Sequence, residues 1–322
     1  MLSNPHCPII AIEEHYWDPE LAGTFTGLEA PKGGEIDKRL YDFADLRIKE
    51  MDAAGVDVQV LSHGAPSAQK LPADTAAVMT RAVNDRLAAQ IAANPKRFAG
   101  FAALPTSDVK GAADEMERAV TRLGFKGVMI HGTANGEYLD DRKFWPIFER
   151  AEALDVPIYL HPALPDPRIT DIYLKDYVKD FPLVVRPAWG YTIDTATQAI
   201  RLVLSGVFEK HPKLKIILGH FGETLPFLLW RIDSSLKRPG QKSLEFRQIF
   251  TNNFWLTTSG FFSDPALLCC VMEMGVDRLL FAIDWPFVID NRPAVEWLSR
   301  IPLSGEDKVK IASGNAKRLL KM

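Results

Sequence analysis

Short apolar runs alternate along the chain with longer segments whose apolar positions recur every three or four residues. The short runs are typical of strands covered on both faces, and the longer segments of amphipathic helices. Alternating strands and helices indicate a parallel sheet with right-handed crossovers, and eight such units close a (β/α)8 barrel. The expected strands lie at residues 9–15, 56–62, 98–104, 126–131, 157–161, 215–220, 254–259 and 279–284. We therefore predict an α/β fold, a TIM barrel with inserted active-site loops, in which residues 1–322 form a single domain.

Three of the intervening helices have recognisable ends. Residues 74–94 begin with an acidic residue and stop at an Asn-Pro pair, while residues 108–123 begin at Asp108 and stop at Gly124. Residues 143–155 carry Trp and Phe at positions that suit packing on the barrel. These signals predict helices on the outside of the barrel.

Two insertions, residues 17–41 and 163–190, interrupt the barrel pattern and are rich in Gly or Pro. Each follows the C-terminal end of a strand, where barrels carry active-site loops. We interpret both as lids or pocket walls. A subunit contact is the alternative, and the two roles are compatible.

The composition is that of an ordinary globular protein, with 47% hydrophobic residues, 25% charged residues and a net charge of −3. It gives no indication of a nucleic-acid or membrane partner, and no apolar run approaches the roughly 18 residues of a membrane span. We expect a cytoplasmic location. The three cysteines, Cys7, Cys269 and Cys270, include an adjacent pair and do not suit a disulfide framework. We interpret Cys269 and Cys270 as inert thiols on a buried helix face.

Acidic and imidazole side chains end three of the predicted strands. Glu13 and His15 end the first, His161 the fifth and Asp284 the eighth. Because the C-terminal ends of barrel strands meet at one rim, these side chains can converge, and carboxylates and imidazoles are usual ligands of a catalytic divalent metal ion. Glu13 and His15 share one face of their strand, whereas Glu14 points the other way and is interpreted as structural. The pattern predicts a metal site at the rim.

Histidines gather at the same rim. Five of the seven end or closely follow predicted strands, and Glu223, three residues after His220, could bond one imidazole nitrogen and turn the other toward the cavity. We interpret the other two, His6 and His211, as solvated surface residues. The five at the rim are His15, His63, His131, His161 and His220.

Seven motifs extend this picture over nearly the whole chain: Ala-Ile-Glu-Glu-His (11–15), Phe-Ala-Ala-Leu-Pro (101–105), Leu-Asp-Val-Pro-Ile-Tyr-Leu-His-Pro (154–162), Ile-Ile-Leu-Gly-His-Phe-Gly-Glu (216–223), Trp-Arg-Ile-Asp (230–233), Leu-Thr-Thr-Ser-Gly (256–260) and Asp-Trp-Pro-Phe (284–287). Together they resemble the amidohydrolase superfamily, in the branch of aminocarboxymuconate-semialdehyde decarboxylase, and within it the γ-resorcylate (2,6-dihydroxybenzoate) decarboxylases.

The resemblance implies a decarboxylase that holds one Zn or Mn ion through Glu13, His15, His161 and Asp284. Hydrolases of the superfamily usually open with His-x-His and often carry a bridging modified lysine. Here Glu13 takes the place of the first histidine, and no lysine ends a central strand. These departures argue against hydrolysis at a two-metal centre.

The resemblance also implies substrate contacts. Arg231 would bind a carboxylate or phenolate through its planar paired donors, and Phe25 and Phe287 would flank the substrate ring. His131 stands where the γ-resorcylate enzymes have Asn, and His63 where they have another polar residue. We expect both histidines to face the ring pocket. Since a buried polar group left unpaired costs about 1–3 kcal/mol, they favour an aromatic acid other than 2,6-dihydroxybenzoate.

The resulting hypothesis is non-oxidative decarboxylation of an ortho-hydroxy aromatic acid, reversible under high bicarbonate. The substrate carboxylate and ortho oxygen are expected to bind the metal ion, and Asp284, or His220 with Glu223, would protonate the ring carbon. The sequence leaves that choice open. A metal-dependent hydrolase or hydratase and a catalytically inactive barrel are the alternatives. Analogy with the family implies a homodimer or homotetramer.

Overall fold

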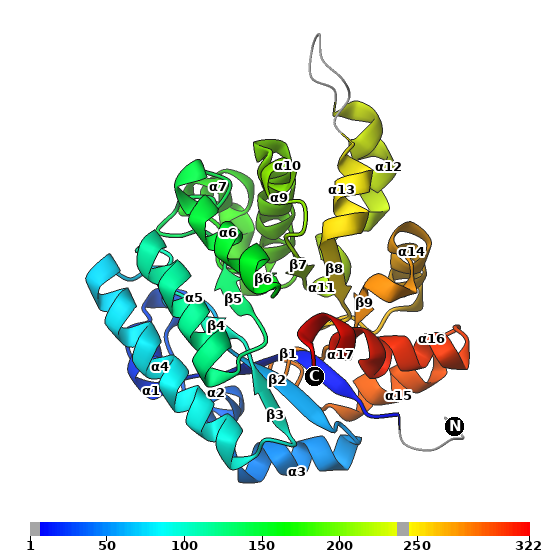
Figure 1. The fold of residues 1–322 in the computed structure, drawn as a ribbon, viewed down its shortest axis with the longest axis horizontal. Helices are drawn as coiled ribbons and strands as arrows, with labels where there is room; N and C mark the ends of the chain where they lie inside the picture. The colour runs from blue at the N-terminus through cyan, green and yellow to red at the C-terminus, as the bar shows by residue number, and fades with distance from the viewer. Residues whose placement is uncertain (1–6, 237–244) are drawn as a thin grey trace.

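Parallel strands form the centre of the molecule and helices surround them (Figure 1). The structure is a computed structural model that describes residues 7–236 and 245–322; His6 lies outside the described residues. Within the described ranges the strands are β1 (Ile10–Tyr16), β2 (Val58–His63), β3 (Phe98–Gly100), β4 (Ala102–Ala103), β5 (Val128–His131), β6 (Ile158–His161), β7 (Ile216–Leu218), β8 (Phe254–Thr257) and β9 (Leu279–Leu280).

The strands pair in parallel in two groups, β1 to β3 and β4 to β9. Backbone hydrogen bonds join the first strand to the segment after the last one: Ile12 N–H donates to Phe281 O (3.2 Å) and His15 N–H to Trp285 O (2.7 Å). The predicted (β/α)8 barrel is confirmed, with every expected strand in its place.

The third predicted strand is divided into β3 and β4. Ala102 N–H donates to the O atom of Gly127, the residue before β5 (3.0 Å), whereas the backbone N–H and C=O of Ala103 face the other side and bond to a helix side chain. Ala103 N–H donates to Asn84 Oδ1 (3.0 Å), and Asn84 Nδ2 donates to Ala103 O (3.0 Å). An amide from an outer helix thus replaces strand pairing at this point of the barrel wall.

The predicted helices are present. Asp108 caps the second by accepting from Gly111 N–H (3.0 Å), and Gly124 ends it with a φ of 76°. The third, predicted at 143–155, is Trp145–Leu154 after a 3₁₀ turn. In the described ranges the helices are α1 (Pro19–Ala22), α2 (Glu35–Leu40), α3 (Asp45–Ala54), α4 (Ala73–Ala93), α5 (Val109–Leu123), α6 (Trp145–Leu154), α7 (Pro167–Tyr173), α8 (Lys175–Val178), α9 (Gly190–Ser205), α10 (Val207–Lys210), α11 (His220–Glu223), α12 (Leu225–Ser235), α13 (Phe246–Asn253), α14 (Asp264–Met274), α15 (Arg292–Arg300), α16 (Gly305–Val309) and α17 (Asn315–Leu320).

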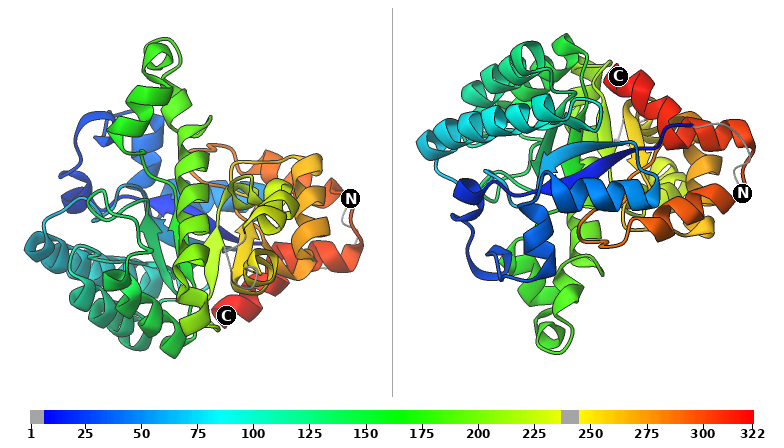
Figure 2. Two further views of the ribbon diagram at one scale, coloured as in Figure 1. Left: turned by 90° about the horizontal axis from the view of Figure 1, so that it is seen from above. Right: turned by 90° about the horizontal axis from the view of Figure 1, so that it is seen from below.

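Both insertions contain short helices. Residues 17–41 hold α1 and α2, and residues 163–190 hold α7 and α8, which stand out from the body as the green projection in Figure 2. The second insertion borders a cavity of about 270 Å³ that is lined by Tyr138, Ile169 and Asp194 among others. This placement agrees with a pocket wall, and the lid role stays a prediction.

Two sequence interpretations are wrong in part. His211 is buried rather than solvated, and its Nδ1 lies 3.0 Å from Glu152 Oε2. Cys270 is buried as expected, but Cys269 is partly exposed and lines a cavity of about 330 Å³ beside Phe227. All three cysteines are free. Among the residues that the structure describes, no helix is long and apolar enough to cross a membrane.

Candidate metal centre

Four side chains meet at the C-terminal rim of the barrel. Glu13 and His15 project from β1, His161 from the end of β6, and Asp284 from the segment after β9. One possible ligand atom from each lies within 4.8 Å of the others. His161 Nε2 is 3.3 Å from Glu13 Oε1, and His15 Nε2 is 3.4 Å from Asp284 Oδ1. The structure thus brings together all four residues that the sequence predicted as ligands.

The chemistry of the group fits a divalent metal ion. Glu13 Oε1 and His15 Nε2 are buried without a hydrogen-bond partner among the described residues, which costs about 1–3 kcal/mol per atom when no cation is present. Burial alone would raise the pKa of the Glu13 carboxyl, but His220 and His161 lower it, while burial lowers the pKa of His15. Ionised carboxylates and neutral imidazoles are the forms that bind metals, and both suit Zn or Mn.

Glu14 lies between two of these residues on β1 but points to the other side, as predicted. Its carboxylate accepts from the backbone N–H groups of Ile283 (2.9 Å) and Trp285 (3.2 Å). These two residues flank Asp284, whose φ of 72° lies in the left-handed region that costs most residues about 1–2 kcal/mol. Glu14 therefore holds the backbone on both sides of a candidate ligand.

Arg47 supports the same part of the site and is fully buried. Its guanidinium donates to His15 O (2.7 Å) and Gln59 Oε1 (3.0 Å), and its central carbon lies 3.9 Å from the centroid of the Trp285 ring. Burial lowers the pKa of Arg47 to about 9. The strand that carries His15 and the segment that carries Asp284 therefore share one buried cationic support.

His220 stands beside the four candidate ligands. Its Nε2 is 3.7 Å from Glu13 Oε1 and 3.8 Å from Asp284 Oδ2, while its Nδ1 is 2.8 Å from Glu223 Oε1. Thr192 donates its hydroxyl to the other oxygen of Glu223 (2.7 Å). Burial alone would lower the pKa of His220, but the Glu223 and Glu13 carboxylates raise it well above its usual value. The predicted His-Glu pair is present, and it turns Nε2 toward the group.

The turn that carries this pair, α11, is left-handed. The φ angles are 52° at His220, 53° at Phe221, 75° at Gly222 and 53° at Glu223, and 68° at Thr224 just after it. Such angles cost most non-glycine residues about 1–2 kcal/mol each and persist where the surrounding structure enforces them. The strained turn is the segment that brings the His220 imidazole and the Glu223 carboxylate together.

The two rim histidines predicted to bind the substrate use their ring nitrogens within the protein. His131 Nε2 lies 2.7 Å from His63 O, and its Nδ1 lies 2.9 Å from His161 Nδ1. His63 Nε2 accepts from Asp18 N–H (3.0 Å), and its Nδ1 lies 2.9 Å from Gly64 O. Each ring nitrogen thus has a partner within the protein, and the substrate contacts of His63 and His131 stay predictions.

The other predicted substrate contacts lie in three different places. Phe287 is 47% exposed, and its ring centroid is 5.7 Å from that of His15. Phe25 is buried, with its ring edge-on to His63 at 5.9 Å. Arg231 is exposed on α12. Phe287 thus lies beside the candidate ligands, whereas Phe25 lies in the first insertion and packs against Trp17 and His63, and Arg231 faces outward. Their substrate contacts stay predictions.

The sequence interpretation missed two residues that hold Glu13. The Tyr159 hydroxyl bonds to Glu13 Oε2, and Thr257 Oγ1 donates to the same oxygen (3.1 Å). Tyr159 lies two residues before His161 on β6 and therefore on the same face of that strand. The alternation of side chains along a strand could have identified Tyr159, because it places Tyr159 on the same face as His161.

The whole architecture matches known proteins. A sequence profile described as Amidohydrolase matches residues 10–322. The chain is 40% identical to a γ-resorcylate decarboxylase of Polaromonas sp. JS666 over 97% of this chain and 98% of that protein. A dihydroxybenzoic acid decarboxylase of Polaromonas sp. JS666 with bound manganese and 2-nitroresorcinol superposes with a TM-score of 0.87 at 40% identity, covering 98% of this chain and 97% of that one. The 5-carboxyvanillate decarboxylase of Sphingomonas paucimobilis has a TM-score of 0.90 at 34% identity, covering 98% and 100%.

Proposed function

The chain belongs to the amidohydrolase family, and from this premise we propose that it is a metal-dependent, non-oxidative decarboxylase of a hydroxybenzoate-type aromatic acid. The observation that carries the proposal is the group of Glu13, His15, His161 and Asp284, which can hold one divalent ion. The first of these residues in the sequence, Glu13, is a carboxylate rather than a histidine. Full-length similarity to several aromatic acid decarboxylases supports the same reaction.

In this reaction the bond between the ring carbon and the carboxylate breaks, CO2 leaves, and the electron pair on the ring carbon takes up a proton. A hydroxyl group ortho to the carboxylate makes protonation of that carbon feasible. The metal ion, when bound, supplies a Lewis acid and a template for the carboxylate and the ortho oxygen. The same steps in reverse carboxylate a phenol.

The chain supplies the proton. His220 Nε2 and Asp284 Oδ2 lie 3.8 Å apart, beyond hydrogen-bond distance but on the same side of the candidate ligand group, and we assign the proton transfer to one of these two residues. The Glu223 carboxylate accepts from His220 Nδ1 and so keeps His220 Nε2 directed at the substrate ring. Thr192 fixes the Glu223 carboxylate in turn.

The direct test is release of CO2 from a panel of aromatic acids that differ in the position of the hydroxyl group. Protein loaded with Mn or Zn should release CO2 from at least one ortho-hydroxy acid and from none of the matched acids without a hydroxyl. Absence of release from every member would contradict the proposal.

Two substitutions separate the roles at the site. Asp284→Asn should remove turnover and weaken metal binding. His220→Asn should keep about one ion per chain but lower turnover by about 10²- to 10⁴-fold, because it removes a proton donor. Asp290→Asn, an exposed carboxylate paired with Arg292, is the control and should change neither quantity. Loss of metal in His220→Asn would make that residue a ligand.

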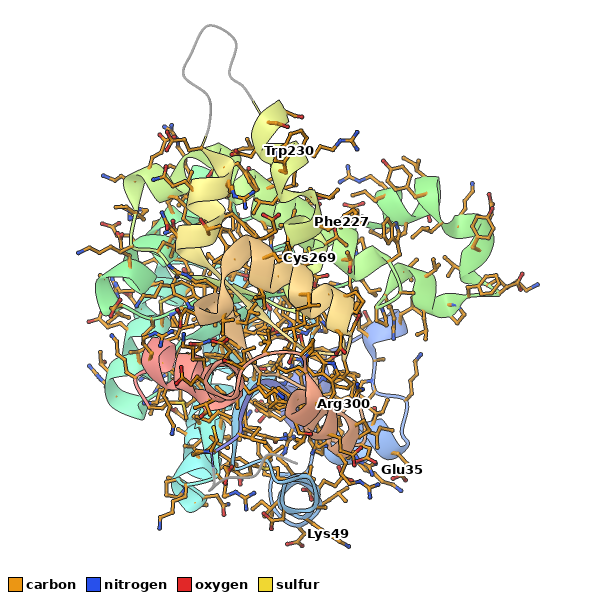
Figure 3. All side chains as sticks on the ribbon, turned by 90° about the vertical axis from the view of Figure 1, so that its right-hand side faces the viewer. Glu35, Lys49, Phe227, Trp230, Cys269 and Arg300 are labelled. Carbon is orange, nitrogen blue, oxygen red and sulfur yellow. The ribbon has the colours of Figure 1, made fainter. Side chains whose placement is uncertain are left out.

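We also propose that the chain assembles as a homodimer or homotetramer. Three large apolar side chains are widely exposed on neighbouring helices: Phe227 (80%) and Trp230 (74%) on α12 and Met272 (82%) on α14. Figure 3 views the molecule from the side on which Phe227, Trp230 and Cys269 are labelled. Exposed apolar clusters are typical of protein interfaces. Sedimentation equilibrium of the full chain would show a single monomeric species if this proposal is wrong.

A further inference from the structure

We propose that His131 is a positioning residue: together with the Pro162 carbonyl it accepts the one hydrogen on His161 Nδ1, and it thereby supports the tautomer whose Nε2 is free to bind the metal ion. The inference rests on the proposed function, because it assumes that His161 is a ligand. It gives His131 a role at the metal site, in addition to the substrate contact that the sequence predicted.

Two backbone carbonyls determine where the protons of both rings lie. His161 Nδ1 is 2.7 Å from Pro162 O, and His131 Nε2 is 2.7 Å from His63 O. A carbonyl oxygen can only accept, so each of these nitrogens carries a hydrogen. His131 Nδ1 then carries no hydrogen and lies 2.9 Å from His161 Nδ1, so Pro162 O and His131 Nδ1 share the one hydrogen of that atom.

The consequence appears at the other end of the His161 ring. With the proton on Nδ1, Nε2 carries a lone pair, and this atom lies 3.3 Å from Glu13 Oε1 inside the candidate ligand group. The opposite tautomer would present a hydrogen to the metal and could not coordinate it. His131 therefore favours the metal-binding tautomer without touching the metal.

The position of His131 is itself fixed. It is 1% exposed, and its ring meets that of His161 at 65° with centroids 4.7 Å apart. The carbonyl that it bonds belongs to His63, whose imidazole is held by Asp18 N–H at one nitrogen and by Gly64 O at the other. A chain of bonds thus runs from the first insertion to the candidate ligand.

Three substitutions at His131 test separately its bond with His161 Nδ1 and its bond with His63 O. In His131→Asn the side-chain oxygen takes the place of Nδ1 and keeps an acceptor for His161. In His131→Gln the amide nitrogen reaches the place of Nε2 and keeps the donor to His63 O, but the acceptor is lost. His131→Phe keeps the ring shape and removes both. Partners of metal-bound histidines are typically worth 10- to 100-fold in metal affinity.

The readout is the dissociation constant for Mn²⁺, obtained by titrating metal-free protein and measuring free Mn²⁺ by electron paramagnetic resonance. Wild type and His131→Asn should agree within about threefold, while His131→Gln and His131→Phe should bind about 10-fold more weakly, the lower end of that range, because Pro162 O still accepts from His161 Nδ1. If His131→Phe does not fold, the Asn and Gln variants still decide the question.

Two results would overturn the inference while leaving the proposed function intact: all variants binding like wild type, or Asn and Gln losing affinity equally, which would indicate a packing role. Wild type that binds no Mn²⁺ or Zn²⁺ would instead overturn the metal role of His161 and the inference together. The melting temperature of each metal-free variant shows whether a change in affinity reflects loss of fold.

Discussion

Asn84 offers a sharp test of how the barrel wall is held at its interruption, through the substitution Asn84→Leu. Asn84 is fully buried on α4 and makes both polar contacts of the Ala103 backbone described above. Leucine has a similar volume and no hydrogen-bonding group. The substitution would leave the N–H and C=O of Ala103 buried and unpaired. Glu115, which also accepts from Asn84 (2.8 Å), keeps its pair with Arg118 and should add little.

The expected loss follows from these two groups. Each unpaired buried backbone group costs about 1–3 kcal/mol, and the apolar leucine side chain recovers part of the sum, so we expect a loss of about 3 kcal/mol. The entropy of unfolding, about 2.1 cal/mol/K per residue near 60 °C, corresponds to roughly 0.7 kcal/mol/K for a chain of this length. The melting temperature should therefore fall by about 4 °C, as measured by differential scanning calorimetry.

Thr80→Val is the matched control on the same helix. Thr80 is also fully buried, but its hydroxyl donates to Ala76 O (2.8 Å), a carbonyl within α4 itself. Valine keeps the shape, and the melting temperature should fall by no more than about 1.5 °C, since a typical hydrogen bond contributes about 1 kcal/mol. The reasoning is refuted if Asn84→Leu melts within 1 °C of wild type, or if the control loses as much.

Two further predictions concern a pH dependence and a strained turn. Burial lowers the pKa of His63 to about 4, so below pH 6.5 the unfolded chain binds a proton there that the folded chain does not. The contribution of the neutral His63 to stability is complete above pH 6.5 and is lost as the pH falls to about 4. In urea unfolding, the difference in unfolding free energy between wild type and His63→Gln should therefore shrink by about 3 kcal/mol between pH 7 and pH 4. A difference that stays constant with pH would contradict this prediction. A Cβ on Gly222, which has a φ of 75°, would lie 2.8 Å from Leu256 Cδ2, so Gly222→Ala should cost about 2–4 kcal/mol of unfolding free energy and lower turnover by displacing His220. A variant with wild-type stability would show that the turn is not strained.

The order of the strands and the four candidate ligands could be predicted because both depend on short-range regularities. A short, continuous apolar run marks each strand, and a polar residue at its C-terminal end must lie at the rim of a parallel barrel. Identifying Glu13, His15, His161 and Asp284 therefore required only knowing where strands end. The side on which Glu14 points followed from the period of two.

The roles of His63 and His131 could not be predicted in the same way. A histidine at the end of a strand has the same sequence signal whether its nitrogens face a cavity or a neighbouring carbonyl. The choice depends on contacts such as His131 with His63 O, 68 residues apart along the chain. Asn84 is a second case, since nothing local distinguishes an amide that completes a barrel wall from one on a helix surface.

The contacts of Glu14 with Ile283 and Trp285 join residues 269 and 271 positions apart, and they have a consequence for how the protein acquires its metal ion. The first strand and the segment after the last strand supply three of the four candidate ligands, so the site cannot be complete until the two ends of the barrel have paired. Contacts of such sequence separation form late, because the entropy of closing the long loop must first be overcome. During synthesis on the ribosome, Asp284 becomes available only after most of the chain has emerged. High-affinity metal uptake is therefore confined to chains that have closed the barrel, and a bound ion marks the end of folding.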